Sequence, residues 1–217
     1  MSTLYRYLSW LWPIRVASRS GRYMELHLEW QNGRLVVDSA RANQSQGSLL
    51  RVWLVVLRDQ LKDRPPPASV LLLGFGAGSA AQVLRREMAF GCPLVGVDGD
   101  PAMLSIARDH FGWAPGPDLE LHCADAAVHL ASEQRSFDLI LVDLFIEDRH
   151  SDLLDSKDFL SSLKQRLTPG GLVLVNTVDH GPGYPERSAR LAGDLRLLFG
   201  HVGSLELEGV NRVFIAR

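Results

Sequence analysis

The stretch Val70-Leu-Leu-Leu-Gly74-Phe-Gly76-Ala-Gly78-Ser-Ala-Ala decides the fold of this chain. Its four apolar residues are typical of a strand that is buried on both faces, and a helical pattern follows the glycines. Glycines allow positive φ and a close approach of ligand to backbone, and the helix N-terminus behind them offers free N–H groups. The sequence therefore predicts a strand, a glycine turn and a helix that together hold a polar or anionic group.

Apolar runs alternate with helical patterns from this point to the C-terminus. Continuous apolar strands separated by helices indicate a parallel sheet covered on both faces. The last two strand candidates are joined too tightly for a helical crossover, so the final strand should be antiparallel. We therefore expect an α/β fold with a Rossmann-like, mostly parallel sheet of seven strands. The last helix is expected near Glu186–Phe199. The strand candidates after the first are Leu94–Val97, Leu119–His122, Leu139–Leu144, Leu172–Thr177, Val202–Leu207 and Arg212–Ala216.

The N-terminal region has a different pattern. Residues Tyr23–Trp30 alternate between apolar and polar, Asn32-Gly33 is a strong hairpin turn signal, and Leu35–Val37 returns as a partner strand. A helical spacing of apolar residues follows over Ser48–Leu61, and three consecutive prolines begin at Pro65. We expect a small β-hairpin and helix region over residues 1–64 and a larger domain over residues 65–217.

Composition excludes several classes of protein. The 217 residues carry a formal net charge of −2. Residues 1–64 are basic, with ten Lys and Arg against five Asp and Glu, and the rest of the chain is acidic. This balance is unsuited to binding nucleic acid by charge alone, and the longest apolar stretch, Leu49–Leu57, is too short to span a membrane. Cys92 and Cys123 form neither a disulfide framework nor a zinc spacing. We expect a cytoplasmic protein with no metal, no nucleic-acid partner and no membrane partner.

Aspartates follow three of the predicted strands. Asp98 lies at the end of the second strand, 24 residues after Gly74, where it can accept hydrogen bonds from ribose hydroxyls. A nicotinamide cofactor is one alternative, but Ser79 stands where its fingerprint has a third glycine, and the GxGxG form fits S-adenosylmethionine better. Asp125 ends the third strand and can either accept from an adenine amino group or cap the following helix.

Asp143 ends the fourth strand after four apolar residues. Partial desolvation there would raise its pKa towards that of a useful base, whereas Asp138 lies at the opposite end and is expected to be structural. The acidic segment that follows is either a solvated loop and helix start or a rim that attracts cations. His150 and His180 are candidates for a different base, and Gly183 and Tyr184 for a flap; the acidic residues are Glu147, Asp148, Asp152, Asp155 and Asp158.

Taken together, these motifs resemble those of the class I methyltransferase fold. They are the glycine turn, Val-Asp98-Gly-Asp100-Pro, Cys-Ala-Asp125-Ala, Phe-Asp138-Leu-Ile-Leu-Val-Asp143 and Leu167-Thr-Pro-Gly-Gly171. Their order resembles that of the spermidine synthase (polyamine aminopropyltransferase) family. The resemblance covers roughly residues 34–177 and includes Gly33-Arg-Leu-Val-Val-Asp38 followed by Gln44.

The resemblance implies a role for each matching position. It assigns Gln44, the glycine turn (Gly74, Gly76 and Gly78) and Asp98 to the nucleoside of decarboxylated S-adenosylmethionine, Asp125 and Ala126 to adenine, and Asp143 to proton abstraction from the attacking amine. The chain departs from the family at Ala77 and Ile146, where the family has aspartates, and near Gly47–Arg51, where its Tyr-His-Glu helix start has no counterpart. Each departure removes a group that would hold a polyamine.

We therefore expect a transferase that uses S-adenosylmethionine or its decarboxylated form as donor. Aminopropyl transfer to an amine is the reaction implied by the resemblance. Methyl transfer to an acceptor other than a polyamine and a non-catalytic nucleoside sensor are the alternatives. The partner is expected to be a small-molecule acceptor, and the aromatic residues near the N-terminus together with the resemblance favour a homodimer; these aromatic residues are Tyr5, Tyr7, Trp10 and Trp12.

Overall fold

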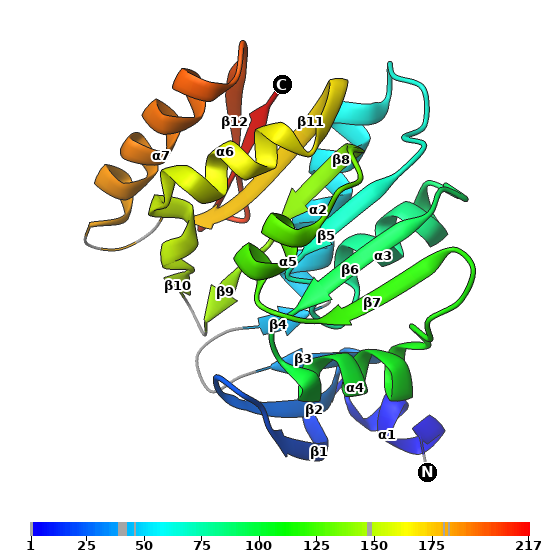
Figure 1. Cartoon of the computed structure of the whole chain (residues 1–217). Helices are drawn as coiled ribbons and strands as arrows, with labels where there is room; N and C mark the ends of the chain where they lie inside the picture. The colour runs from blue at the N-terminus through cyan, green and yellow to red at the C-terminus, as the bar shows by residue number, and fades with distance from the viewer. Residues whose placement is uncertain (1, 39–42, 46, 147–148, 180, 182) are drawn as a thin grey trace.

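The computed structural model contains a large sheet of seven strands and a small sheet of four strands, placed side by side (Figure 1). A separate two-stranded sheet is formed by β9 (Phe145–Ile146) and β10 (Arg149–His150). The structure describes residues 2–38, 43–45, 47–146, 149–179, 181 and 183–217. The large sheet occupies the C-terminal two thirds of the chain. The small sheet lies against its lower end in the view of Figure 1, near the N-terminus.

The large sheet has seven strands in the order β12-β13-β11-β8-β5-β6-β7. The five strands from β11 to β7 in this order pair in parallel, and β13 pairs antiparallel with both β11 and β12. The predicted Rossmann-like sheet with an antiparallel last strand is therefore confirmed. The strands are β5 (Val70–Leu73), β6 (Leu94–Asp98), β7 (Leu119–Cys123), β8 (Phe137–Val142), β11 (Leu167–Val178), β12 (Val202–Leu207) and β13 (Asn211–Ala216).

Helices cover both faces of this sheet because its strands are apolar on both sides. Leu71 and Leu73 of β5 face the cluster formed with α5 (Ala126–Ser132), α6 (Lys157–Gln165) and α7 (Tyr184–Leu198). Val70 and Leu72, their alternating neighbours, face the opposite cluster. The helices on that side are α2 (Gly47–Leu61), α3 (Ser79–Gln82), the π-helical η1 (Val83–Glu87) and α4 (Pro101–Phe111).

The small sheet is larger than the predicted hairpin. The hairpin itself is formed by β2 (Glu25–Gln31) and β3 (Arg34–Asp38), and β1 (Ile14–Ser20) and β4 (Asn43–Ser45) extend it to the order β1-β2-β3-β4. The short helix α1 (Ser2–Leu8) precedes it, and Ser9 holds it to the hairpin turn because its Oγ accepts from the N–H of Gly33. An apolar cluster of Leu26, Leu28 and Val37 with Met103 and Ile106 of α4 fixes this sheet to the larger one.

Helix α2 packs on the large sheet and also contacts β4 of the small one. Val52, Trp53, Val56 and Leu57 are fully buried in the cluster that contains Val70 and Leu72. A division of the chain at residues 64 and 65 stays a prediction, but α2 belongs by its contacts to the core of the larger sheet. Ser48 and Leu49, in the first turn of α2, line the cavity described below.

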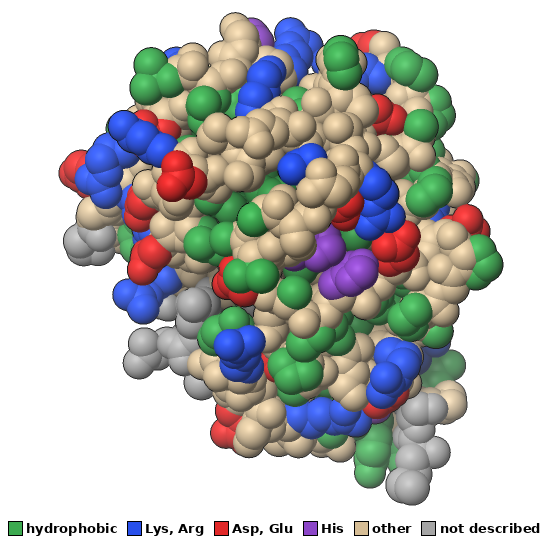
Figure 2. Space-filling model, viewed as in Figure 1, with side chains coloured by type: hydrophobic (Ala, Val, Ile, Leu, Met, Phe, Trp, Pro, Cys, Tyr) green, Lys and Arg blue, Asp and Glu red, His purple; other side chains and the backbone are tan. Residues whose placement is uncertain are grey.

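Charged side chains of both signs are interspersed over the face shown in Figure 2, in keeping with the near-neutral composition. No helix among the described residues is long and apolar enough to cross a membrane. Tyr7, Trp10 and Trp12 are exposed, with 70%, 67% and 56% of their surface accessible. The homodimer stays a prediction.

Candidate active site

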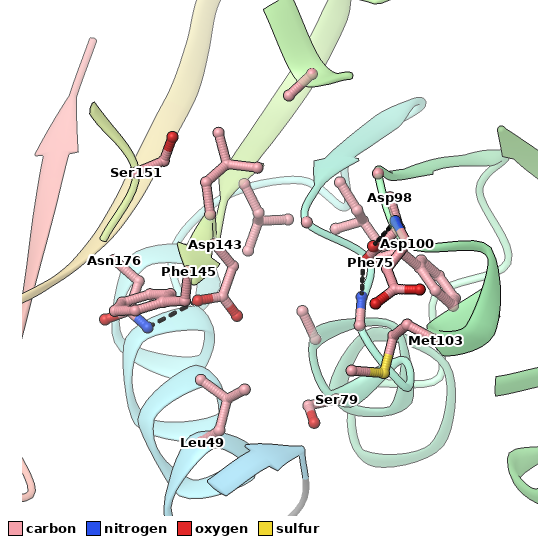
Figure 3. A pocket seen from close by; sticks show the side chains of 18 of the residues that line it. Leu49, Phe75, Ser79, Asp98, Asp100, Met103, Asp143, Phe145, Ser151 and Asn176 are labelled. Atoms are coloured by element: carbon pink, nitrogen blue, oxygen red, sulfur yellow. Dashed lines mark hydrogen bonds between the residues drawn. The ribbon is translucent and has the colours of Figure 1, made fainter. Parts of the chain in front are cut away.

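A cavity of about 610 Å³ opens where the large sheet meets the small one. It lies beyond the carboxyl ends of β5, β6, β7, β8 and β11, the edge at which open α/β sheets bind ligands. Figure 3 shows two groups of side chains facing each other across it, with Asp98, Asp100 and Met103 on one side and Asp143, Phe145 and Asn176 on the other. The predicted convergence of strand ends therefore produces a real cavity.

The glycine turn after β5 requires glycine for two reasons. Gly74, Gly76 and Gly78 have φ values of 85°, 58° and 86°, which side chains rarely adopt. In addition, a Cβ on Gly74 would overlap the backbone carbonyl oxygen of Asp143, and one on Gly78 would overlap the indole of Trp113. The turn is thus packed between the fourth strand's end and the protein interior, and its backbone lines the cavity.

Asp98 links the glycine turn to the loop that follows β6 through two hydrogen bonds. Its Oδ2 accepts from the backbone N–H of Gly76 at 2.8 Å, and its Oδ1 accepts from that of Asp100 at 2.9 Å. Burial raises the pKa of Asp98 to about 6, against the lowering effect of these two bonds. A carboxylate has about four lone-pair sites, so each oxygen keeps capacity for a further donor from a ligand.

Asp125 performs the capping role that the sequence allowed. It is the N-cap of α5, and its Oδ1 accepts from the N–H groups of Ala127 and Val128 at 2.9 and 3.1 Å. The residue is exposed and lines the cavity together with Ala126. Capping and ligand binding are compatible, because both capping bonds use the same carboxylate oxygen.

Asp143 is held by neutral donors on both of its oxygens. The indole Nε1 of Trp53 donates to Oδ2 at 2.8 Å, and the amide Nδ2 of Asn176 donates to Oδ1 at 2.9 Å. Asn211 in turn donates to Oδ1 of Asn176 at 3.1 Å. Burial raises the pKa of Asp143 to about 6, while the bonds from Asn176 and Trp53 lower it. The hydrogen-bond partners that the structure shows for Asp143 include no cation, so no positive charge offsets the effect of burial on its pKa.

The small sheet supplies one wall of the cavity. Tyr23, Met24 and Leu26 line it, and Asp100 ties their strand turn in place by accepting from the N–H of Arg22 at 2.9 Å. The other oxygen of Asp100 caps α4 through the N–H of Ala102. Gln44 falls in β4, but its side chain lies outside the described part of the structure, so its nucleoside role stays a prediction.

Two of the acidic residues in the segment after β8 are paired with one arginine. Arg187 of α7 forms ion pairs with Asp152 and Asp155 and donates to the backbone carbonyl oxygens of His150 and Ser151. These contacts favour the structural interpretation of the segment over a cation-attracting rim. The elements involved are β9 (Phe145–Ile146), β10 (Arg149–His150) and the 3-10 helix η2 (Asp152–Asp155).

The two histidine candidates have different outcomes. His150 is 3% exposed and packs against Tyr184, and burial lowers its pKa to about 4, so it is a core residue rather than a solvated base. It is not among the residues that line the cavity. His180, like Glu147 and Asp148, lies outside the described residues. Tyr184 does line the cavity, and the flap suggested for this segment stays a hypothesis.

Sequence reasoning missed Trp53, Asn176 and the anchoring role of Asp100. Trp53 fits the apolar helical spacing of α2 and gave no polar signal. Asn176 could have been found, because it is the polar amide in an otherwise apolar run of β11 and is fully buried. Asp138 is structural as expected, since it accepts from the N–H of Ala68 and the hydroxyl of Thr168 at the far end of β8.

The charges that line the cavity all have one sign. Its described lining includes four carboxylates and no Lys or Arg; the four are Asp98, Asp100, Asp125 and Asp143. Among the described residues, no group of three or more His, Cys, Asp or Glu side chains could hold a metal ion. The cavity is thus suited to a ligand that carries positive charge.

Comparisons with known proteins agree with this geometry. Residues 70–171 match a methyltransferase domain family. The chain is 28% identical to a polyamine aminopropyltransferase of Vibrio vulnificus over 70% of its own length and 51% of the relative's. It is 27% identical to the human eEF1A lysine and N-terminal methyltransferase over 70% of its own length and 23% of the relative's. The chain thus spans about half the length of the first relative, or less for the second.

A solved structure extends the likeness to the small sheet. The probable spermidine synthase from Corynebacterium glutamicum superposes with a TM-score of 0.71 and covers 93% of this chain and 79% of its own, at 17% identity. Identity at this level shows a shared fold. The superposed part of the chain is nevertheless longer than residues 70–171, which match the methyltransferase domain family.

Proposed function

The chain has the class I S-adenosylmethionine-dependent methyltransferase fold and resembles polyamine aminopropyltransferases, and from this premise we propose that it is an aminopropyltransferase-like enzyme. Its donor would be decarboxylated S-adenosylmethionine, and its acceptor an amine. The observation that carries this proposal is Asp143, a carboxylate with a raised pKa that lines a cavity whose described charges are all negative.

The donor would occupy the side of the cavity around Asp98. Ribose hydroxyls can donate to the lone pairs of Asp98 that Gly76 and Asp100 leave unused. The exposed Asp125 lies at the end of the neighbouring strand β7, where its uncommitted oxygen can accept from an adenine amino group. The glycine turn allows the donor to lie directly against the backbone.

The charge of the lining favours the decarboxylated donor. S-adenosylmethionine and its decarboxylated form differ by one carboxylate, which needs a cationic or N–H partner. Like charges at close range are repulsive, and the described lining contains four carboxylates without a Lys or Arg to offset them. Removing the ligand's carboxylate leaves a sulfonium and an ammonium group, both attracted by this lining.

Asp143 would take the proton that blocks attack by the acceptor. An ammonium group has no lone pair, so the acceptor must first lose a proton, which Asp143 accepts. The free amine then attacks the propyl carbon bonded to sulfur: a C–N bond forms, the C–S bond breaks, and its electron pair neutralises the sulfonium. A base with a pKa of about 6 is mostly ionised at neutral pH and therefore ready to accept a proton.

Calorimetric binding of three nucleosides tests the donor assignment. The titrations use S-adenosylmethionine, decarboxylated S-adenosylmethionine and methylthioadenosine, each with the parent protein and with Asp143→Asn. We expect the decarboxylated donor to bind more tightly than S-adenosylmethionine, and Asp143→Asn to retain donor binding while losing turnover. Binding of none of the three would refute the nucleoside site, and full turnover by Asp143→Asn would remove it as the base.

Methyl transfer to an amine is the second candidate. The similarity to the human eEF1A lysine and N-terminal methyltransferase favours it, since that name describes methylation of amines. The same base would serve, because the amine must again be deprotonated before attack. Tighter binding of S-adenosylmethionine together with methylated product would support this reaction; tight nucleoside binding without turnover of any amine would support a sensor.

A further inference from the structure

The side of the cavity around Asp143 combines apolar side chains with that carboxylate and a few neutral polar groups. Phe145 lies two residues after Asp143 in the chain, on the same side of the cavity as Asn176 (Figure 3). The apolar side chains come from five separate parts of the fold, so the character of this wall is not due to one element. They are Leu49, Leu144, Phe145, Leu153, Val178 and Val210.

The polar groups on this side are neutral. Ser48, Ser151, Tyr184 and Asn211 offer hydroxyl and amide groups, and Asp143 is the one charged side chain among the described residues of this wall. The nearby Asp152 and Asp155 do not line the cavity and are paired with Arg187. An acceptor therefore meets one carboxylate surrounded by apolar and neutral groups.

This arrangement is unfavourable to an acceptor with two ammonium groups. One ammonium can pair with Asp143, but a second would leave water for a wall whose described residues include no other charged side chain, and an unpaired buried charge is strongly disfavoured. A hydrocarbon or aromatic body in the same place would instead gain free energy, because its apolar surface would be removed from water against the six apolar side chains.

We propose that the acceptor is a primary monoamine with an apolar body, bound with its amine at Asp143 and its hydrocarbon part against Leu153, Val178 and Val210. This proposal rests on the proposed function for the role of Asp143. It goes beyond the proposed function because it names the class of acceptor. Linear diamines and longer polyamines are then not the preferred substrates.

Two acceptors of matched length test the proposal: pentylamine, and 1,5-diaminopentane, which differs by a second terminal amine. Turnover is measured with saturating donor, and binding of each amine is measured by calorimetry with methylthioadenosine present. We expect kcat/KM and affinity to favour pentylamine by about 10-fold or more. Equal or better use of the diamine would overturn the proposal, as would failure of both amines to bind.

The two measurements separate this proposal from the proposed function. Preferential binding of pentylamine without transfer of any group would refute the transferase reaction and leave the ligand class standing. Transfer with a preference for the diamine would leave the reaction standing and refute the monoamine. If the diamine is preferred, repeating the assay with Glu147→Gln and Asp148→Asn shows whether these residues supply its second partner.

A new carboxylate on the apolar wall should change the preference. Val210 is 43% exposed and lines the cavity, so Val210→Asp adds a charge near Asn211 without burying it. We expect the ratio of diamine to monoamine kcat/KM to rise about 3-fold, the size of a partly exposed ion pair. The matched control is Val55→Asp on α2, 48% exposed and outside this cavity, which should leave the ratio unchanged. An unchanged ratio in Val210→Asp would contradict the placement of the acceptor.

Discussion

The indole Nε1 of Trp53 donates a 2.8 Å hydrogen bond to Oδ2 of Asp143, 90 residues away in the chain. Trp53 is fully buried in the middle of α2, so the bond connects the helix core directly to the cavity. With Asn176 on the other oxygen, it holds the carboxylate between two neutral donors. Asp143 is therefore oriented without being neutralised.

Replacing Trp53 by Phe should alter the pH dependence of the reaction. The bond from Trp53 lowers the pKa of Asp143, so its loss should raise that pKa above about 6 and move the acid limb of the kcat/KM profile to higher pH. Turnover lost at pH 7 should then be partly regained at pH 8.5. Loss of the buried donor should also lower the unfolding free energy by about 2 kcal/mol.

Trp12→Phe is the control for this experiment, because Trp12 is exposed and lies outside the cavity. Its pH profile and its denaturation curve should match those of the parent. A Trp53→Phe profile that is lower at every pH but unshifted would show that Trp53 acts through packing alone.

The raised pKa values of Asp98 and Asp143 predict a loss of stability with rising pH. Both carboxyls bind their protons more tightly in the folded chain, with pKa values near 6, than in the unfolded chain, where Asp titrates near 4. Their ionisation therefore destabilises the fold as pH rises from about 4 through 6, and the penalty is constant above that range. Asp143→Asn should reduce the drop in melting temperature between pH 5 and pH 7. The exposed Asp63→Asn should not reduce it, and an unchanged drop in Asp143→Asn would argue against the raised pKa.

The main sheet could be predicted because local patterns determine it. Buried parallel strands are short apolar runs, and Val70–Leu73 and Leu94–Asp98 each show such a run followed by turn residues. The strand β1 was not predicted, because its burial alternates irregularly around a register shift between Arg15 and Ala17. The short helix α1 and the placement of α2 depend on tertiary contacts that no local pattern contains.

The candidate site was predictable only in part for the same reason. Asp98, Asp125 and Asp143 could be placed because strand ends in a parallel sheet share one edge. Their hydrogen-bond partners could not, since Trp53 looks like any apolar residue of an amphipathic helix, and Arg187 lies 35 residues from Asp152. Long-range polar pairs of this kind leave no periodic signal in a single sequence.

Gly74→Ala should destabilise the fold more than glycine strain alone can explain. Gly74 and Gly112 both have positive φ, 85° and 77°, but a Cβ on Gly112 meets nothing within 4 Å, whereas one on Gly74 overlaps the carbonyl of Asp143. We expect Gly112→Ala to cost about 1–2 kcal/mol, and Gly74→Ala to cost about 1–3 kcal/mol more because the backbone after β8 must shift. Urea denaturation of both variants measures the difference. Equal losses of unfolding free energy in the two variants would show that the backbone at the end of β8 shifts without destabilising the fold.

Arg187→Ala should weaken acceptor binding more than donor binding. Arg187 holds the segment after β9 through Asp152, Asp155 and the carbonyl of Ser151, and Ser151 and Leu153 in that segment line the Asp143 side of the cavity. Hydrogen bonds from a charged group are among the stronger ones, so their loss should raise the acceptor KM by about 10-fold. Donor affinity, set around Asp98 on the opposite side, should change by less than about 2-fold.

Arg190→Ala on the exposed surface of the same helix is the matched control and should change neither the acceptor KM nor the donor affinity. A parallel loss of donor and acceptor binding in Arg187→Ala would mean that the segment supports the whole cavity rather than one wall.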